Sequence, residues 1–382
     1  MTFWVCISLF AFFLLLSIHP FVTYPLSLMP FRRNSEPPAA SDALPTFAIC
    51  VCAYNEERTI ADKARNMIML ADTVPDCELF IYVDGATDRT VEKLQPFRDR
   101  INVVAADVRR GKSHGMNVLV GKCTADVIVF TDANVELDQA ALRALAPWFS
   151  DPEIGCVCGH LIYSNPDESA MASSGSLYWR IEEAIKQLES DAYSVVGADG
   201  SLYAVRRSAH HTVPDDIIDD FYVSMMILAD GRRVVRAPLA LAFEKSATNT
   251  YDEFRRKIRI ACQAFNVHRL IWPRIWRSPV LAYCYVSHRL LKWLIGYNLL
   301  LAAFFLVVAM MMVFSPVMVL VLLALAAAAF AGLLAVRFGP AQKVLAMLLS
   351  FAGTSWGVWR SMRGDRFQTW TPTPSARASG QG

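Results

Sequence analysis

Two long uncharged runs in the C-terminal part of the chain restrict its fold more than any other feature. Residues 293–314 and 317–336 contain no charged side chain, and a Ser-Pro pair separates them. An α-helix needs roughly 20 apolar residues to cross a bilayer, so each run is long enough. A third apolar run, residues 3–31, precedes the central part of the chain. The sequence therefore predicts a globular region between membrane segments.

The first apolar run is interpreted as a transmembrane anchor, residues 1–31. A cleaved signal peptide is the alternative, but such a peptide has a basic start and a small-x-small cleavage site, and the sequence shows neither. Arg32 and Arg33 follow the run directly. Since basic flanks lie on the cytoplasmic side, we expect an external N-terminus and a multi-pass protein of the inner membrane with a cytoplasmic globular domain. A Pro/Ala/Ser-rich linker, residues 32–45, leads into that domain.

The C-terminal membrane region is expected at residues 280–359, with spans at about 293–314 and 317–336. Its last apolar segment, residues 344–359, is shorter than the other two. Two interpretations are open, a third span or a helix that lies in the membrane interface. The second is favoured because it keeps the arginines of the tail, residues 360–382, on the cytoplasmic side.

Residues 46–250 have the composition of an ordinary globular domain, in which apolar runs alternate with segments of helical periodicity. This alternation predicts an α/β fold around a parallel or mixed, Rossmann-like sheet. The predicted strands are Phe47–Tyr54, Glu78–Asp84, Ile101–Ala106 and Val127–Asp132. The 37 basic and 35 acidic residues of the chain give a net charge of +2, which offers no argument for nucleic acid binding. The nine cysteines form no C-x-x-C pair, so structural zinc is not expected.

Polar side chains follow three of these strands directly. They are Tyr54, Glu56, Asp84, Asp132 and Asn134. In a parallel sheet ligands bind beyond the carboxyl ends of the strands, so we expect these groups to line one site. The apolar run Val127–Phe130 leads straight into such an end. An acid in this position indicates a ligand that is cationic or rich in hydroxyl groups.

A run of acids precedes a predicted apolar helix in the stretch PDDIIDDFYVSMMIL. Asp215, Asp216 and Asp219 fit the N-terminal end of that helix, where negative charge and capping side chains are stabilising. Capping explains Asp220 less well, because this residue lies inside the expected first turn beside Phe221.

Residues 251–279 are predicted to form a basic amphipathic helix next to the membrane hairpin. Its cations either face phospholipid headgroups or bind an anionic substrate, and both interpretations are open. The candidates for the second role are Arg255, Arg256 and Arg259.

A set of motifs along the central region resembles that of membrane-integrated family-two glycosyltransferases, the group of the cellulose, chitin, hyaluronan and poly-N-acetylglucosamine synthases. The motifs are AYNEE, DGATDRT, RRGKSHGMN, FTDAN, GADGSLYAVRR and DDFYVSMMI, in this order. The resemblance covers residues 47–272 and the flanking apolar runs. It implies a GT-A-type fold and the inverting transfer of a sugar from a nucleotide sugar, with UDP as the favoured nucleotide. The implied acceptor is a lipid-linked or growing saccharide of a cell-surface polysaccharide.

The resemblance also implies which residues bind the donor. Tyr54, Glu56 and Asp84 would hold the nucleoside, and Lys112 would lie near the nucleotide. The physical chemistry agrees, because a leaving nucleoside diphosphate gains negative charge that positioned Lys and Arg groups stabilise.

Metal binding and proton transfer are implied at two further places. Asp132 and Asn134 match the D-x-D motif that binds Mg²⁺ or Mn²⁺, cations that need only one or two protein carboxylates beside substrate phosphates. Asp220 matches the acid proposed as the base that accepts the proton of the acceptor hydroxyl.

The sequence departs from the family pattern in two respects. Asn134 is a neutral and weaker ligand at the second position of the D-x-D motif. The Q-x-x-R-W motif of processive synthases is absent, so single addition and polymerisation are both open. A non-catalytic membrane subunit and another nucleotide-sugar enzyme, such as a nucleotidyltransferase, are the alternative functions. Membrane lipids and other polysaccharide-assembly proteins are candidate partners.

Overall fold

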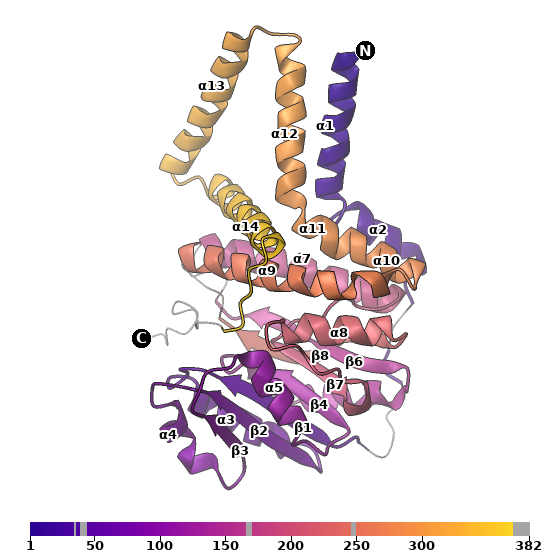
Figure 1. Cartoon of the computed structure of the whole chain (residues 1–382), viewed down its shortest axis with the longest axis vertical. Helices are drawn as coiled ribbons and strands as arrows, with labels where there is room; N and C mark the ends of the chain where they lie inside the picture. Colours follow the sequence, from indigo (N-terminus) through magenta and orange to yellow (C-terminus); the bar gives the residue numbers. More distant parts are fainter. Residues whose placement is uncertain (34–35, 39–43, 166–169, 246–249, 370–382) are drawn as a thin grey trace.

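The computed structural model describes residues 1–33, 36–38, 44–165, 170–245 and 250–369. Its centre is an eight-stranded sheet with the strand order β3-β2-β1-β4-β7-β6-β8-β5 (Figure 1). The first four strands are β1 (Phe47–Ala53), β2 (Cys77–Asp84), β3 (Asn102–Ala106) and β4 (Val127–Thr131). These four strands pair in parallel, so their carboxyl ends lie at one edge of the sheet.

The second half of the sheet is mixed. Its strands are β5 (Glu136–Leu137), β6 (Ile154–Tyr163), β7 (Leu202–Arg206) and β8 (Arg233–Glu244). β7 runs antiparallel to both β4 and β6, while β6 and β8 are parallel. The prediction of an α/β fold with a parallel or mixed sheet is therefore confirmed.

Helices cover both faces of the sheet, which is why a central strand such as β1 is buried along its whole length. One core contains side chains of α3 (Ile60–Ala71), α4 (Thr90–Leu94) and α6 (Ala141–Leu145). The other contains side chains of α5 (Lys112–Val120), α7 (Ala170–Ala192), α8 (Asp219–Ala229) and α9 (Thr250–Ile275).

A layer of helices lies between the sheet and the long apolar helices (Figure 1). It includes α2 (Thr23–Leu28), α7, α9, α10 (Pro279–Cys284) and α14 (Gly339–Met362). The helices α14 and α9 touch closely at Gly357, where an added Cβ would overlap the carbonyl oxygen of Ile258. Segment 344–359 thus belongs to one helix that packs on the basic helix. Its position relative to a bilayer stays a prediction.

The apolar helices are α1 (Thr2–Ile18), α12 (Ile295–Met311) and α13 (Pro316–Ala335), of which α1 and α12 lie side by side (Figure 1). Among the described residues, α13 is the one straight helix that is long and apolar enough to cross a membrane. Two bent pairs pass the same test only when their halves are combined: Thr2–Ile18 with Thr23–Phe31, bent by 67°, and Pro279–Trp293 with Ile295–Met311, bent by 68°.

The bends differ from the straight segments that the apolar runs predict. Pro20 follows the end of α1, and proline cannot supply the backbone N–H that a continuing helix needs. Before α12, Lys292 is held at 2.8 Å by Glu182 of α7, which ties the chain to the globular part. Hydropathy alone cannot show such a tether, and the straight helix α12 begins at Ile295, after the bend.

Candidate active site

The edge formed by the carboxyl ends of β1, β2 and β4 holds the candidate residues. Asp84, which ends β2, is fully buried. Its two carboxylate oxygens accept the backbone N–H groups of Arg110 at 2.7 Å and Gly111 at 2.9 Å. Gly111 has a φ of 98°, a value that suits glycine, and α5 begins at the next residue, Lys112. Asp84 therefore fixes the loop that presents Lys112.

The loops after β1 and β2 are joined to each other. Asn55 accepts the backbone N–H of Thr87 at 2.8 Å, and the backbone N–H of Glu56 donates to Thr90 Oγ1 at 2.8 Å. The Glu56 side chain is almost fully buried and accepts a hydrogen bond from Thr59 at 2.9 Å. These contacts of Glu56 order the loop after β1.

Tyr54 lies under a cation. The guanidinium carbon of Arg109 is 3.5 Å from the centroid of the Tyr54 ring. Arg109 belongs to the same loop that Asp84 fixes, so a planar base bound at Tyr54 would also meet a positive charge. Sequence reasoning did not single out Arg109.

Lys112 connects the acids from the other elements. Its Nζ lies 2.8 Å from Asp132 Oδ1, just beyond β4, and 3.4 Å from Asp219 Oδ1, at the start of α8. Burial opposes the charge on Lys112, but the nearby carboxylates of Asp132, Asp219 and Asp220 outweigh it and raise its pKa. The lysine is therefore positively charged in the free protein.

Three predicted side chains meet around Gly200. A Cβ added to this glycine would lie 3.1 Å from Lys112 Nζ, 3.2 Å from Asp220 Oδ2 and 3.4 Å from Asp132 Oδ2. The structure thus brings the candidate base, the candidate diphosphate ligand and the candidate metal ligand to one point. A larger residue at position 200 would occupy the space between them.

Asp220 and Asp219 have different surroundings although they are neighbours. Burial, followed by the charge of Asp219, raises the pKa of Asp220 to about 7. Asp219 accepts a hydrogen bond at 2.8 Å from the Tyr203 hydroxyl, a group that sequence reasoning missed because Tyr203 resembles any aromatic core residue of a strand. Asp219 thus contacts Tyr203 and Lys112, while Asp220 is poised to take a proton near neutral pH.

The prediction that Asp215 and Asp216 lie at the N-terminal end of α8 is wrong, whereas Asp219 lies in the first turn of α8, as expected. The helix begins at Asp219 after the N-cap residue Ile218, which makes no side-chain cap. Asp215 lies 3.3 Å from His114 Nδ1, and Asp216 pairs with Arg366 at 3.0 Å. Both acids meet basic groups from distant parts of the chain, which the local sequence cannot reveal.

Asn134 belongs to a second group of side chains near the metal candidate. Its Nδ2 donates to Glu244 Oε1 at 3.0 Å, which fixes the orientation of the amide. Glu244 ends β8 opposite Tyr163, and Arg256 of α9 bonds with Tyr163. Burial disfavours the charge of Arg256, but Tyr163, Glu253 and Glu244 outweigh it and raise its pKa.

The three arginine candidates of α9 have different neighbours in the structure. Arg255 lies over the ring of Tyr251, with 5.6 Å between its guanidinium carbon and the ring centroid. Arg259 donates to Gln263 of the same helix at 3.2 Å. Arg256 is linked to the Asn134 side of the site through Tyr163 and Glu244.

The oxygen donors near β4 fit a divalent cation only when substrate oxygens complete its coordination. Within the described ranges, no three His, Cys, Asp or Glu side chains form a group that could hold a metal ion. Asp132 and the amide oxygen of Asn134 are the candidate ligands. Mg²⁺ and Mn²⁺ accept such a sparse set when phosphate oxygens complete the coordination. The residues present therefore fit a cation that arrives with a diphosphate.

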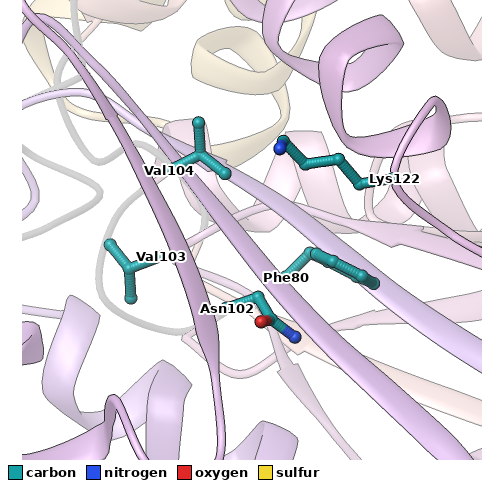
Figure 2. Close-up of a pocket in the computed structure, with 5 residues that line it drawn as sticks. All are labelled: Phe80, Asn102, Val103, Val104 and Lys122. Atoms are coloured by element: carbon teal, nitrogen blue, oxygen red, sulfur yellow. The ribbon is translucent and has the colours of Figure 1, made fainter.

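A pocket of about 490 Å³ lies elsewhere, between the start of β3 and the end of α5 (Figure 2). It is lined by Phe80, Asn102, Val103, Val104 and Lys122. Asn102 is the first residue of β3, so this hollow is at the opposite end of the strands from Asp84. It is separate from the candidate active site.

Comparisons with known proteins agree with this geometry. Residues 48–213 match the family described as "Glycosyl transferase family 2". Poly-beta-1,6-N-acetyl-D-glucosamine synthase of Staphylococcus aureus (strain COL) is 26% identical over 220 residues, which are 56% of this chain and 53% of that protein. The protein of the same name from Staphylococcus epidermidis is 23% identical over 254 residues, 64% of this chain and 61% of that protein. The chain spans about half the length of the curated relatives it matches.

Among solved structures, the mannosyltransferase PcManGT from Pyrobaculum calidifontis in complex with GDP-Man and Mn²⁺ is similar, with a TM-score of 0.69 and 20% sequence identity. The match covers 95% of this chain and 99% of that one. This similarity establishes the fold, the GT-A type that the motifs imply.

Proposed function

We propose that this protein is an inverting glycosyltransferase that transfers a sugar from a nucleotide sugar, with UDP as the favoured nucleotide, to a saccharide acceptor. The observation that carries the proposal is the convergence of Lys112, Asp132 and Asp220 around Gly200. These groups come from three separate elements and supply a cation for a diphosphate, a ligand for a divalent metal and a base.

Donor binding uses the loops at the carboxyl edge of the sheet. Tyr54 and Arg109 offer a stacked ring and a cation to the nucleoside, while Asp84 and Glu56 order the loops that hold them. Lys112 leaves its ion pair with Asp132 to face the diphosphate. Arg256 is the second candidate cation, with Arg255 and Arg259 further along the same helix.

Asp132 and Asn134, together with the diphosphate, would hold Mg²⁺ or Mn²⁺, which would supply Lewis-acid stabilisation of the leaving group. Asp220 orients the acceptor hydroxyl and takes its proton while that oxygen bonds to the anomeric carbon. The bond from this carbon to the diphosphate breaks on the opposite face, so the configuration inverts. The products are the glycoside, the nucleoside diphosphate and a protonated Asp220, which then releases its proton to water.

The helices suggest where the acceptor comes from. The long apolar helices are on the far side of the α7–α9–α14 layer from the sheet (Figure 1), and the matched relatives are named as poly-N-acetylglucosamine synthases. These observations support a multi-pass protein of the inner membrane with a cytoplasmic catalytic domain. Its acceptor is then a lipid-linked or growing saccharide of a cell-surface polysaccharide, with other assembly proteins as partners.

The test is a screen of nucleotide sugars with the purified full-length protein in detergent. The readout is released nucleoside diphosphate, and the Asp220→Asn variant is the control. We expect one donor to be turned over in the presence of Mn²⁺ and the variant to be far slower. Nucleotide binding without turnover of any donor, with membrane saccharide extracts added as acceptor, would instead identify a non-catalytic subunit.

A further inference from the structure

Lys63 is a buried basic side chain that none of the roles above uses. It lies on α3, and the residue is only 3% exposed. Its Nζ donates to Thr131 Oγ1 at 3.1 Å and to the backbone carbonyl of Val135 at 2.6 Å. These two acceptors lie immediately before and immediately after the turn that contains Asp132 and Asn134.

A second branch of the same network reaches Gly200. The Thr131 hydroxyl donates to the backbone carbonyl of Ser201 at 2.7 Å, and Thr131 is fully buried. One ammonium group thus joins three backbone segments: the end of β4, the exit of the turn and, through Thr131, the segment that follows Gly200. All three border the point where Lys112, Asp132 and Asp220 converge.

The placement of the ammonium group has a free-energy cost that packing alone does not require. Burial lowers the pKa of Lys63 to about 7, with the charges of Asp132 and Glu136 opposing the shift. An apolar side chain would fill the same volume without this cost. What it would lack is the pair of hydrogen bonds across the turn.

We infer that Lys63 is the positioning residue of the turn that carries Asp132 and Asn134, and that it sets the geometry in which these residues bind a divalent cation with a nucleoside diphosphate. The inference rests on the proposed function for the identity of the ligand. Lys63 does not touch that ligand. It acts from beneath the turn, because its hydrogen bonds hold the two ends at a fixed separation.

The chain offers a matched control one turn further along α3. Asn66 is also buried, and it forms two hydrogen bonds with the backbone of Leu137, donating to the carbonyl at 2.8 Å and accepting the N–H at 3.0 Å. It therefore holds the same segment, but beyond the turn. Asn66→Leu should destabilise the fold as much as Lys63→Met does and leave the turn intact.

The experiment measures Mn²⁺ binding to the full chain in the presence of UDP or GDP, by the loss of the free Mn²⁺ electron paramagnetic resonance signal. We expect Lys63→Met to raise the dissociation constant about tenfold, as the loss of about 1.4 kcal/mol would do. Lys63→Arg should restore part of the affinity, because it keeps hydrogen-bond donors at this position. Asn66→Leu should lower the melting temperature without changing the dissociation constant.

The outcomes separate this inference from the proposed function. Equal Mn²⁺ affinity in folded Lys63→Met and in the wild type would overturn the inference alone, as would an equal loss in Asn66→Leu. Tight Mn²⁺ binding by the wild type without turnover of any nucleotide sugar would overturn the proposed activity, while the variants still decide the role of Lys63. A wild-type protein that binds no Mn²⁺ with either nucleotide would overturn the inference as well.

Discussion

Lys112 and Asp132 neutralise each other across 2.8 Å in the free protein, yet each is the candidate for an opposite partner in the donor complex. The lysine suits the diphosphate, and the aspartate suits the divalent cation. A cation that arrives alone would have to displace the lysine from Asp132. A cation that arrives with a diphosphate gives the lysine a new anionic partner, so the two binding events should assist each other.

Metal and nucleotide are therefore expected to bind cooperatively. Chelation should abolish nucleotide-sugar turnover, and Mg²⁺ or Mn²⁺ should restore it. Asp132→Ala should weaken nucleotide binding by about tenfold or more even in excess metal, since charge-assisted contacts contribute about 1.5–3 kcal/mol. Calorimetric titration of UDP and GDP with and without Mn²⁺ measures both effects. Full activity in chelator would show that cationic side chains alone stabilise the leaving group.

The topology is testable without any substrate. Arg32 and Arg33, together with the basic flanks of the C-terminal apolar helices, predict an external N-terminus and a cytoplasmic catalytic domain. A reporter fused after residue 45 should give a cytoplasmic signal, and one fused near Ser315 should give an external signal. An external signal from the first fusion would separate the domain from the cytosolic supply of nucleotide sugars and contradict the proposed function.

Asp220→Asn tests the base directly. The substitution keeps the shape of the side chain and removes its basicity, so turnover should fall by about 10²- to 10⁴-fold, the usual contribution of a positioned base. The affinity for the nucleotide sugar should change little, because Asp220 is expected to touch the acceptor. Steady-state kinetics give both values.

Asp219→Asn is the matched control for that variant. Asp219 contacts Tyr203 and Lys112, so its loss should cost turnover much less. A larger loss in Asp219→Asn than in Asp220→Asn would assign the base to Asp219. If both variants were folded and fully active, the proton-transfer step would be wrong.

Part of this site can be predicted from the sequence, because the carboxyl ends of parallel strands lie at the same edge of the sheet and bring the polar residues there together. Asp84 and Asp132 were predictable in that way, whereas Lys112, at the start of α5, was expected only from the resemblance of its motif. The partners of Asp215 and Asp216 were not, because His114 and Arg366 are far from them along the chain.

For Lys63, the sequence predicts that a buried acceptor exists but does not identify it. It lies three residues after Ile60 and one before Ala64, both fully buried, so it falls within the apolar stripe of α3. A cation in such a stripe is a visible signal that a buried acceptor exists. The sequence does not say that the acceptor is the turn beyond β4, since that depends on how α3 packs.

The stability of the protein should depend on Asp220 with a definite sign. The folded-state pKa of about 7 is above the ordinary value of 3.8, so the ionised carboxylate is disfavoured by folding. Above pH 7 the ionised carboxylate destabilises the folded wild type by the full amount. As the pH falls from 7 toward 4, protonation of Asp220 removes this destabilisation. Asp220→Asn should therefore raise the melting temperature above pH 7, by about 2–4 °C per kcal/mol regained, with a gain that shrinks at lower pH. A gain independent of pH would contradict the shifted pKa.

The pH dependence of the rate supplies the last test. Turnover requires ionised Asp220, so the rate should fall as the pH is lowered through about 7, approaching tenfold per pH unit. Burial and the charges of Asp219 and Asp199 raise the pKa of Asp220, while Lys112 and the backbone N–H of Phe221 lower it. Asp219→Asn removes the largest of the raising charges, so its acid limb should move to lower pH although its maximal rate changes little. Values of kcat/KM for the donor measured from pH 5 to 9, which report groups of the free enzyme, would decide between the assignments. An acid limb that stays in place in Asp219→Asn means that the titrating group is not the carboxylate of Asp220.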